Sequence, residues 1–241
     1  MNKKMDARLP RDRVLEVAAR LFAEQGIDAV SVRDITGAAG VNLGTINYHF
    51  GSKENLIHEV FETLLAPLQE RRLALLDQIE AQAGDGPLDL ELVLRAIVEP
   101  TIRSSIGQEG AVVYLPRLMF QVYAVARPFL GEKNSELNDR VAKRFIDAIS
   151  RAAPGVPYEQ VCWRYYMVVG GFLQLVSDAL GSNRLHRLSD GCCDTGDPNR
   201  VIEELITFFM QGMTAPAGSL RQDAFNNPGR EAFLEALASP F

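Results

Sequence analysis

The chain has 241 residues, of which 47% are hydrophobic and 23% charged, and its formal net charge is −6 at pH 7. This composition provides ample material for one large or two small globular domains, and no stretch approaches the roughly 18 uninterrupted apolar residues that a membrane span needs. Three cysteines, two of them adjacent, do not make a disulfide framework, and the first residues lack the apolar core of a signal peptide, so we expect a cytoplasmic protein.

The first quarter of the chain is predicted to form three short helices. A basic segment at residues 1–10 precedes an amphipathic helix at residues 11–25, which Gly26 ends. The apolar side chains of this helix recur at helical spacing: Val14, Leu15, Ala18, Leu21 and Phe22. We expect them to pack on apolar residues of the next two helices and so to form a small three-helix head.

Two helices joined by a tight turn follow. Ser31 is placed to cap the first of them, with Asp34 three residues further on to complete a capping box. Gly40 ends this helix, because a residue without Cβ readily adopts the left-handed conformation of a helix end. Asn42 can then cap the second helix. The segment therefore predicts a helix-turn-helix.

The second of these helices has two different faces. Ile46 and Phe50 are four residues apart and can both face the core. The opposite face carries Gly44, Thr45, Asn47 and Tyr48. Gly44 allows close approach of a partner, and Asn47 offers the donor and acceptor pair that matches adenine. This face predicts a helix that reads base edges in DNA.

The segment resembles the DNA-binding signature of the TetR family of transcriptional regulators. The turn at Gly40-Val41, residues 47–50 (Asn-Tyr-His-Phe) and residues 51–56 (Gly-Ser-Lys-Glu-Asn-Leu) match in order, spacing and residue type. The resemblance covers roughly the first quarter of the chain, and beyond it only the helical architecture matches. Thr36-Gly37 stands where the family more often has Ala and a longer side chain. Asn47 replaces a commoner Tyr, so base preference is not transferable.

We assign DNA contacts by chemistry and by this resemblance. Phosphate contacts are assigned to Ser31, Arg33, Tyr48, His49 and Lys53. Lys53 also lies at a helix N-terminus, whose free N–H groups favour an anion. Base contacts are assigned to Thr45 and Asn47, with Gly44 giving access. The alternative for Tyr48 and His49 is that they only pack beneath the recognition helix.

The net negative charge at first argues against a nucleic-acid partner, but its distribution does not. Residues 1–53 hold eight basic and six acidic residues, so this segment is +2 and the remainder of the chain is −8. An acidic body would be held away from the phosphates while the head contacts them. Lys3, Lys4 and Arg8 belong either to a disordered terminus or to an arm that reaches along DNA.

A long helix is expected to connect the head to the rest of the chain. Ser52 caps it, and its apolar pattern continues to Leu65. Pro67 falls inside the pattern and is expected to kink or break the helix. In the TetR family such a helix transmits movement of the body to the recognition helix. We therefore divide the chain into a DNA-binding domain (1–53), an effector-binding and dimerisation domain (54–215) and a C-terminal tail (216–241).

The fold class is predicted to be all-α, because no alternating strand pattern occurs. After a loop at residues 84–87, helices are expected at about 88–105, at 111–126 with an interruption at Pro116, from a Ser135 cap to Pro154, from Pro157 to Gly181, and from Asp197 and Pro198 onward. Residues 185–196 are expected to form an irregular connection, and the tail to hold one short helix at 230–238.

The last two body helices are apolar on more faces than a single core needs. We expect them to pair with their copies as a four-helix bundle in a homodimer, as the family resemblance also implies. The residues assigned to this interface are Val169, Gly170, Phe172, Leu175, Val176, Val201, Leu205, Phe208 and Phe209. The alternative is that both helices are central helices of a monomer.

Aromatic and apolar side chains at helical spacing predict an effector pocket in the body. The assigned residues are Tyr114, Phe120, Tyr123, Trp163, Tyr166 and Met167, with Arg103 and Arg117 as anchors for an anionic group. Taken singly, each aromatic residue is more often core than pocket lining. Arg164 is a further candidate anchor. An elongated apolar acid, such as an acyl chain or its thioester, is the favoured effector.

Other chemistry is not indicated. His186 with the adjacent Cys192 and Cys193 supplies too few ligands for a metal site, although a thiol sensor stays an alternative. No phosphate loop or nucleophile motif points to an enzyme, and no cofactor is expected. We therefore expect a ligand-responsive repressor that binds a palindromic operator as a homodimer. The alternative is a DNA-organising protein controlled by a protein partner.

Overall fold

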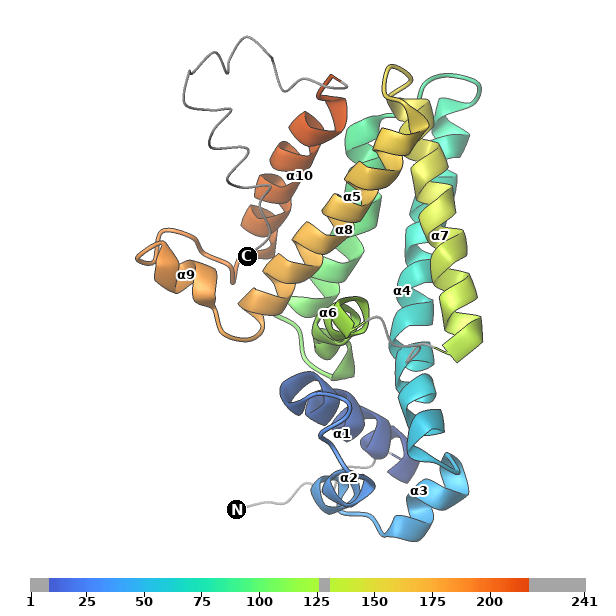
Figure 1. Ribbon diagram of the computed structural model, residues 1–241, viewed down its shortest axis with the longest axis vertical. Helices are drawn as coiled ribbons and strands as arrows, with labels where there is room; N and C mark the ends of the chain where they lie inside the picture. Colours follow the sequence, from blue (N-terminus) through green and yellow to red (C-terminus); the bar gives the residue numbers. More distant parts are fainter. Residues whose placement is uncertain (1–8, 126–130, 217–241) are drawn as a thin grey trace, which may run out of the picture.

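The computed structural model describes residues 9–125 and 131–216, which are helical throughout apart from their connections. Figure 1 shows a small head of three helices at one end of an elongated body. The head contains α1 (Pro10–Gln25), α2 (Val32–Ala39) and α3 (Leu43–His49). The body contains α4 (Lys53–Ala83), α5 (Leu90–Ser105), the 3-10 helix η1 (Ala111–Tyr114), α6 (Leu115–Val125), α7 (Gly131–Ala152), α8 (Tyr158–Ala179), α9 (Arg184–Leu188) and α10 (Pro198–Thr214).

The head has its own apolar core, as the sequence predicted. Val14 and Phe22 of α1 are fully buried, and Ile35 of α2 and Ile46 of α3 reach the same core. α1 contacts both α2 and α3, so each amphipathic helix covers the apolar faces of the other two. This packing fixes the angle at which α3 leaves the head, and it leaves the polar face of α3 outside.

Side-chain caps define the ends of the head helices. The Oγ atom of Ser31 accepts the N–H of Asp34 at 3.2 Å, and the carboxylate of Asp34 accepts the N–H of Ser31 at 2.8 Å, which completes the predicted capping box. Gly40 adopts a left-handed conformation with φ +63°. Asn42 then caps α3 by accepting the N–H of Thr45 at 3.0 Å. The predicted turn is therefore present.

One helix joins the head to the body. α4 begins at the Ser52 cap, where Ser52 Oγ accepts the N–H of Asn55 at 3.1 Å, and it runs the length of the body in Figure 1. It continues through Pro67, so the predicted break does not occur. A proline inside a helix costs about 3 kcal/mol. Burial of neighbouring side chains, including Leu64, Leu65 and Leu68, offsets that cost.

The body helices pack around a continuous apolar core. α5 contacts both α4 and α10, α7 packs against α4, and α6 lies against α8. α6 and η1 also contact α1, so the body touches the head through elements other than α4. None of the helices in the described ranges combines the length and the apolar character that a bilayer crossing requires.

Several predicted boundaries in the body are wrong. α7 begins at Gly131, so Ser135 lies within the helix and does not cap it. The interruption predicted at Pro116 is present one residue earlier: η1 ends at Tyr114 and α6 begins at Leu115, with Pro116 in its first turn, where a missing N–H costs nothing. The connection at 185–196 overlaps a short helix, α9. The predicted tail helix at 230–238 and the basic residues Lys3, Lys4 and Arg8 lie outside the described residues.

Candidate DNA-binding surface and effector pockets

The outward face of α3 is open to solvent. Tyr48 is 85% exposed, and Asn47 and His49 are also exposed, while Ile46 holds the opposite face in the core. The rings of Tyr48 and His49 meet edge to face with 5.0 Å between centroids. Because Tyr48 is so exposed, it does not pack beneath the helix. Its phenol and the Asn47 amide are free to contact a partner laid against α3.

Polar groups in the first turn of α3 are used in the cap of the helix. The hydroxyl of Thr45 donates to Asn42 Oδ1 at 3.3 Å, so part of its predicted base-reading capacity is used within the turn. A Cβ added at Gly44 would lie 3.0 Å from the same Asn42 oxygen. Gly44 therefore makes room for the cap in addition to giving access to the helix. On this face, the Asn47 amide is not used in the cap hydrogen bonds that occupy Asn42 and Thr45.

The predicted phosphate contacts surround α3. Arg33 is exposed on α2, and Lys53 begins α4, where its Nζ donates weakly to the carbonyl of Asp28 at 3.5 Å. The hydroxyl of Ser31 donates to the Asp34 carboxylate at 2.6 Å. Its capping role occupies this hydroxyl, which makes Ser31 the least available of the predicted phosphate contacts. The two cations and the exposed Tyr48 hydroxyl retain that capacity.

Comparison with known proteins agrees with both parts of the fold. The family model described as bacterial regulatory proteins, tetR family, matches residues 14–60, and the model described as tetracyclin repressor-like, C-terminal domain, matches residues 95–212. Together they cover more than half of the chain. The chain belongs to the TetR family. The head described above is thus the family's regulatory DNA-binding unit, and α5 to α10 lie almost entirely within its C-terminal domain.

Individual TetR-family relatives match in part. The chain is 32% identical over 129 residues to the HTH-type transcriptional regulator AcrR of Shigella flexneri, which is 54% of each chain. It is 32% identical over 130 residues to the HTH-type transcriptional repressor KstR2 of Rhodococcus jostii, which is 54% of this chain and 60% of that protein. The matched region thus spans little more than half of these curated relatives.

Solved structures show the same fold at low sequence identity. A transcriptional regulator from Saccharomonospora viridis, solved in complex with choline, has a TM-score of 0.56 at 21% identity, covering 83% of this chain and 95% of that one. The ketosteroid transcriptional regulator KstR2 of Mycobacterium tuberculosis has a TM-score of 0.55 at 19% identity, covering 86% and 95%.

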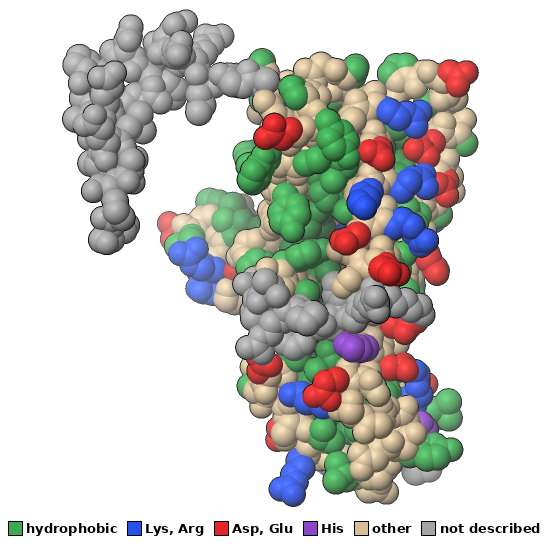
Figure 2. All heavy atoms as spheres, turned by 45° about the vertical axis from the view of Figure 1, so that its right-hand side comes forward, with side chains coloured by type: hydrophobic (Ala, Val, Ile, Leu, Met, Phe, Trp, Pro, Cys, Tyr) green, Lys and Arg blue, Asp and Glu red, His purple; other side chains and the backbone are tan. Residues whose placement is uncertain are grey.

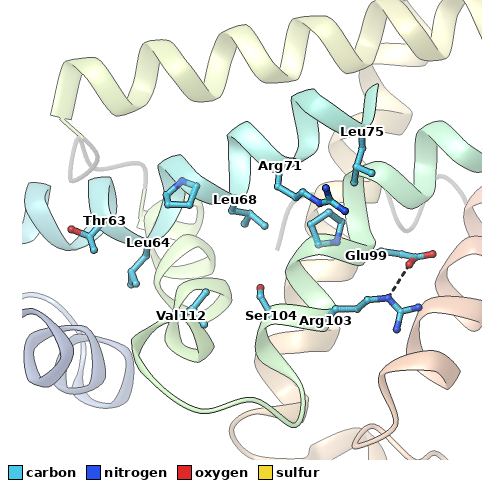
Figure 3. A pocket seen from close by; sticks show the side chains of 11 residues that line it. Thr63, Leu64, Leu68, Arg71, Leu75, Glu99, Arg103, Ser104 and Val112 are labelled. Atoms are coloured by element: carbon cyan, nitrogen blue, oxygen red, sulfur yellow. Dashed lines mark hydrogen bonds and ion pairs between the residues drawn. The ribbon is translucent and has the colours of Figure 1, made fainter. Parts of the chain in front are cut away.

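A broad surface hollow lies between α4 and α5. Figure 3 shows its walls: Leu64, Leu68, Arg71 and Leu75 come from α4, Glu99, Arg103 and Ser104 from α5, and Val112 from η1. Its volume is about 690 Å³, and it is broadly open. The predicted anchor Arg103 does line it, but its Nε donates to Glu99 at 3.0 Å and its Nη1 donates to Asn199 at 3.0 Å. This guanidinium is therefore already paired.

A second, more enclosed pocket lies among α6, α7 and α8. Its volume is about 360 Å³, within the range of small-molecule sites. The aromatic residues Phe120, Tyr123, Tyr165 and Tyr166 line it. Three of them, Phe120, Tyr123 and Tyr166, are among the residues that the sequence assigned to an effector pocket. Behind it is a small chamber of about 30 Å³ that reaches into the core and shares the walls formed by Tyr123 and Asn138.

The other predicted effector residues lie elsewhere. Trp163 and Met167 are 61% and 66% exposed on the outer face of α8 and line neither pocket. Tyr114 borders a shallow hollow against α1, and Arg117 lies beside Gly181. Arg164 donates to the carbonyls of Met213 and Ala215 and so holds the end of α10. Helical spacing alone did not distinguish the inner from the outer face of α8.

Sequence reasoning missed Arg72, which borders the inner chamber. It stands in the buried stripe of α4, four residues after Leu68 and four before Leu76. An arginine at a stripe position is the signal that could have identified it, because charged residues are almost never buried without a purpose.

The predicted dimer residues fall on two sides of their helices. Phe172, Val176, Val201, Leu205 and Phe209 are buried within the single chain, so they are core residues and this part of the prediction is revised. Gly171 admits the ring of Phe209, whose Cζ would lie 3.3 Å from an added Cβ. Val169 and Leu175 are half-buried, and Gly170 and Phe208 face outward.

The outward faces of α8 and α10 are unusually apolar. Their exposed residues include Trp163, Tyr166, Met167 and Phe208, the last of them 73% exposed. Figure 2 shows apolar side chains gathered on the upper part of the body, beside a band in which acidic and basic side chains alternate. In the described part of the chain, no three His, Cys, Asp or Glu side chains gather in a way that could hold a metal ion.

Proposed function

We propose that this TetR-family protein is a transcriptional repressor that binds a palindromic operator as a homodimer and is released by a small amphipathic effector. The exposed polar face of α3, held on a packed helix-turn-helix, is the observation that carries this proposal. In this class of DNA-binding unit the recognition helix enters the major groove, and a dimer places two of them about 34–36 Å apart.

The apolar outer face of α8 and α10 supports the homodimer. An exposed apolar patch on a protein with this composition marks an interaction site, and a two-fold dimer uses the same patch on both copies. In place of the buried residues, we assign the interface to Trp163, Met167, Gly170 and Phe208, which face outward. Two pairs of antiparallel helices would then form a four-helix bundle.

Two physical links connect the effector pockets with the head. α4 extends unbroken from the pocket walls to Lys53, beside α3. On α6, Phe120 and Tyr123 line the enclosed pocket, while Gln121 between them donates to the carbonyls of Phe22 and Ala23 at the end of α1, both at 3.2 Å. A ligand that moves α6 therefore pulls directly on α1. The ligand releases DNA only to the extent that it binds more tightly to the conformation in which the two heads of the dimer have a different spacing.

The hollows in the body favour this function over that of a DNA-organising protein controlled by a protein partner. A chain that needs no ligand has no reason to keep an aromatic-lined pocket of about 360 Å³ beside the helix that holds the head.

The test of DNA recognition compares two substitutions. Duplexes enriched by the wild-type protein from a random library serve as specific DNA, and a shuffled duplex serves as control, both followed by fluorescence anisotropy over a salt series. Asn47→Ala is expected to lose about 10- to 100-fold on the enriched site only, because it removes a base contact. Lys53→Ala is expected to weaken both duplexes and to reduce the salt slope by about one. Equal losses on both duplexes for both variants would refute this assignment.

Mass measurement in solution tests the dimer. The wild-type protein is expected at twice the mass of the chain, and the paired substitution Met167→Glu and Phe208→Glu is expected to give monomers, because it buries charges in the proposed interface. A wild-type monomer that binds the palindrome would contradict the proposed bundle.

A further inference from the structure

The inner chamber of the body holds an arginine that is not neutralised. The guanidinium of Arg72 donates to Thr101 Oγ1 at 2.6 Å and to Gln69 Oε1 at 3.2 Å, and it lies 5.6 Å from the centroid of the Phe172 ring. Its Nε is buried and has no hydrogen-bond partner. Among the side chains of residues 9–123 and 135–216, no carboxylate forms an ion pair with it within 4 Å.

This arrangement is costly for the protein without a ligand. Neutral amide and hydroxyl oxygens cannot balance a full charge, and a buried charge without a counter-ion is strongly unfavourable. Burial accordingly lowers the pKa of Arg72, although the nearby phenols of Tyr165 and Tyr123 act in the opposite direction. The side chain nevertheless remains charged at neutral pH, because a guanidinium is not deprotonated in proteins. A site of this kind is complementary to an anion.

Two other arginines of the body, Arg95 and Arg144, are paired with carboxylates. Arg95 is paired with Glu91, Glu99 and Glu203, and Arg144 is paired with Asp77 and Glu80. Arg144 is 40% exposed, where a carboxylate adds little stability, and Arg95 is half-buried. Arg72, whose Nε is buried, has no such partner among the described side chains.

A chain of hydrogen bonds leads from Arg72 to the enclosed pocket. Gln69 accepts from Arg72 and donates through Nε2 to Asn138 Oδ1 at 2.8 Å, and Asn138 Nδ2 donates to the hydroxyl of Tyr123 at 2.9 Å. Tyr123 and Asn138 line both the chamber and the enclosed pocket, and so does Tyr165. Burial raises the pKa of Tyr165 to about 12, so its phenol is a neutral donor at pH 7. The inner chamber that holds Arg72 and the apolar pocket are thus adjacent.

We propose that the effector is an amphipathic anion whose carboxylate binds Arg72 in the inner chamber while its apolar body fills the pocket lined by Phe120, Tyr123 and Tyr166. This inference rests on the proposed function and specifies its ligand class. Binding of the effector's carboxylate displaces the Gln69 or Thr101 oxygen from the guanidinium and places a charge-assisted pair in a low-dielectric site. Tyr123 lines both the chamber and the pocket, and it lies two residues from Gln121, which holds α1.

A cationic effector is the competing outcome. The aromatic pocket also borders Asp139, and aromatic faces attract quaternary ammonium groups. The Saccharomonospora viridis structure contains choline. Asp139 is exposed, however, and therefore well screened by water, whereas the Arg72 charge is buried and repels a cation from the chamber. The buried charge is expected to dominate head-group selection.

The test uses three probes with the same tail and different heads: octanoate, 1-octanol and octyltrimethylammonium. Their dissociation constants are measured by calorimetry on the full-length protein. The wild type is expected to bind octanoate about 10- to 100-fold more tightly than octanol, and the cation more weakly than either. Arg72→Met is expected to abolish the preference for octanoate. Arg144→Met removes a paired surface arginine as the matched control and is expected to keep the preference.

The head-group comparison on the wild type decides the proposal even if Arg72→Met does not fold. A preference for octanol or for the cation, or binding of none of the probes at about 1 mM, would overturn the anion site. Retention of the octanoate preference in folded Arg72→Met would overturn the role of Arg72. Neither result bears on operator binding by the wild type, which is measured on DNA without any probe, so failure of the proposed function remains distinguishable.

Discussion

The two capped helices of the head, α2 and α3, and the adjoining start of α4 each begin at a side chain that accepts a backbone N–H from three residues further along. Ser31, Asn42 and Ser52 are thus satisfied within their own turns. The centre of the body is different. There Arg72 is held by Thr101 of α5, and Gln69 is held by Asn138 of α7, so polar groups depend on residues far away in sequence. The helix starts of the head are determined by local hydrogen bonds, whereas the body keeps an unbalanced charge that a bound anion can balance.

The largest effect is expected from the head core. Phe22→Ala should lower the free energy of unfolding by about 3–5 kcal/mol, because Phe22 is fully buried and the head is too small to close the cavity. Thermal unfolding followed by circular dichroism measures the loss. Tyr158→Ala, at a 55% exposed position, is the control and should change stability by only about 0.5 kcal/mol. Similar losses for both variants would contradict the assignment of a separate head core.

The buried charge in the body is expected to act in the opposite direction. Arg72→Met should leave the ligand-free protein as stable as the wild type or raise its stability by about 1–2 kcal/mol, because an apolar side chain of similar length removes an uncompensated charge. Denaturant unfolding measures this difference. A loss of more than about 2 kcal/mol would show that Arg72 serves the fold, and the contrast between head and body would not hold.

The caps of the head provide a smaller test. Asn42→Ala should cost about 1 kcal/mol, since it leaves the N–H of Thr45 without its acceptor at the start of α3. The loss should appear in hydrogen exchange of residues 43–49 before it appears in the body, because the cap is a local interaction. Equal acceleration of exchange throughout α8 would show that the head and the body unfold as one unit.

The smallest expected effect is a pH dependence of the α2 cap. Hydrogen bonds from the hydroxyl and the N–H of Ser31 lower the pKa of Asp34 below its ordinary value of 3.8. The carboxylate therefore stabilises the folded head above that value, and its contribution is lost as the pH falls through the lower pKa of the folded state. A carbon-detected NMR titration should show this depressed pKa in the wild type and a smaller depression in Ser31→Ala, which removes the hydroxyl but keeps the N–H of residue 31.

The parts of the molecule that sequence predicted well are those that local rules determine. The capping box at Ser31, the left-handed Gly40 and the Asn42 cap follow from spacings of three residues or fewer, and each is present. Residues of α8 were harder to place. Both Phe172 and Trp163 are apolar and at helical spacing, but which of them faces inward depends on where α6, α7 and α10 pack.

The candidate effector site shows the same limit. Phe120, Tyr123 and Tyr166 line one pocket, as their sequence pattern predicts. Arg103 and Arg164, two of the predicted anchors, are bound to other groups, and the pattern does not single out Arg72. Sequence indicates which residues can anchor an anion. Only the three-dimensional arrangement shows which arginine lacks a counter-ion, because its carboxylate partners would come from distant helices.

The most direct test of the central claim is selection of DNA by the full-length protein from a random duplex library, with Asn47→Ala selected in parallel. We predict that the wild type enriches two inverted half-sites whose centres are about one helical turn, or a multiple of it, apart, and that Asn47→Ala loses the preference at one base position in each half-site. Failure of the wild type to enrich any sequence, or identical motifs from both proteins, would contradict the account of α3 as the helix that reads the operator.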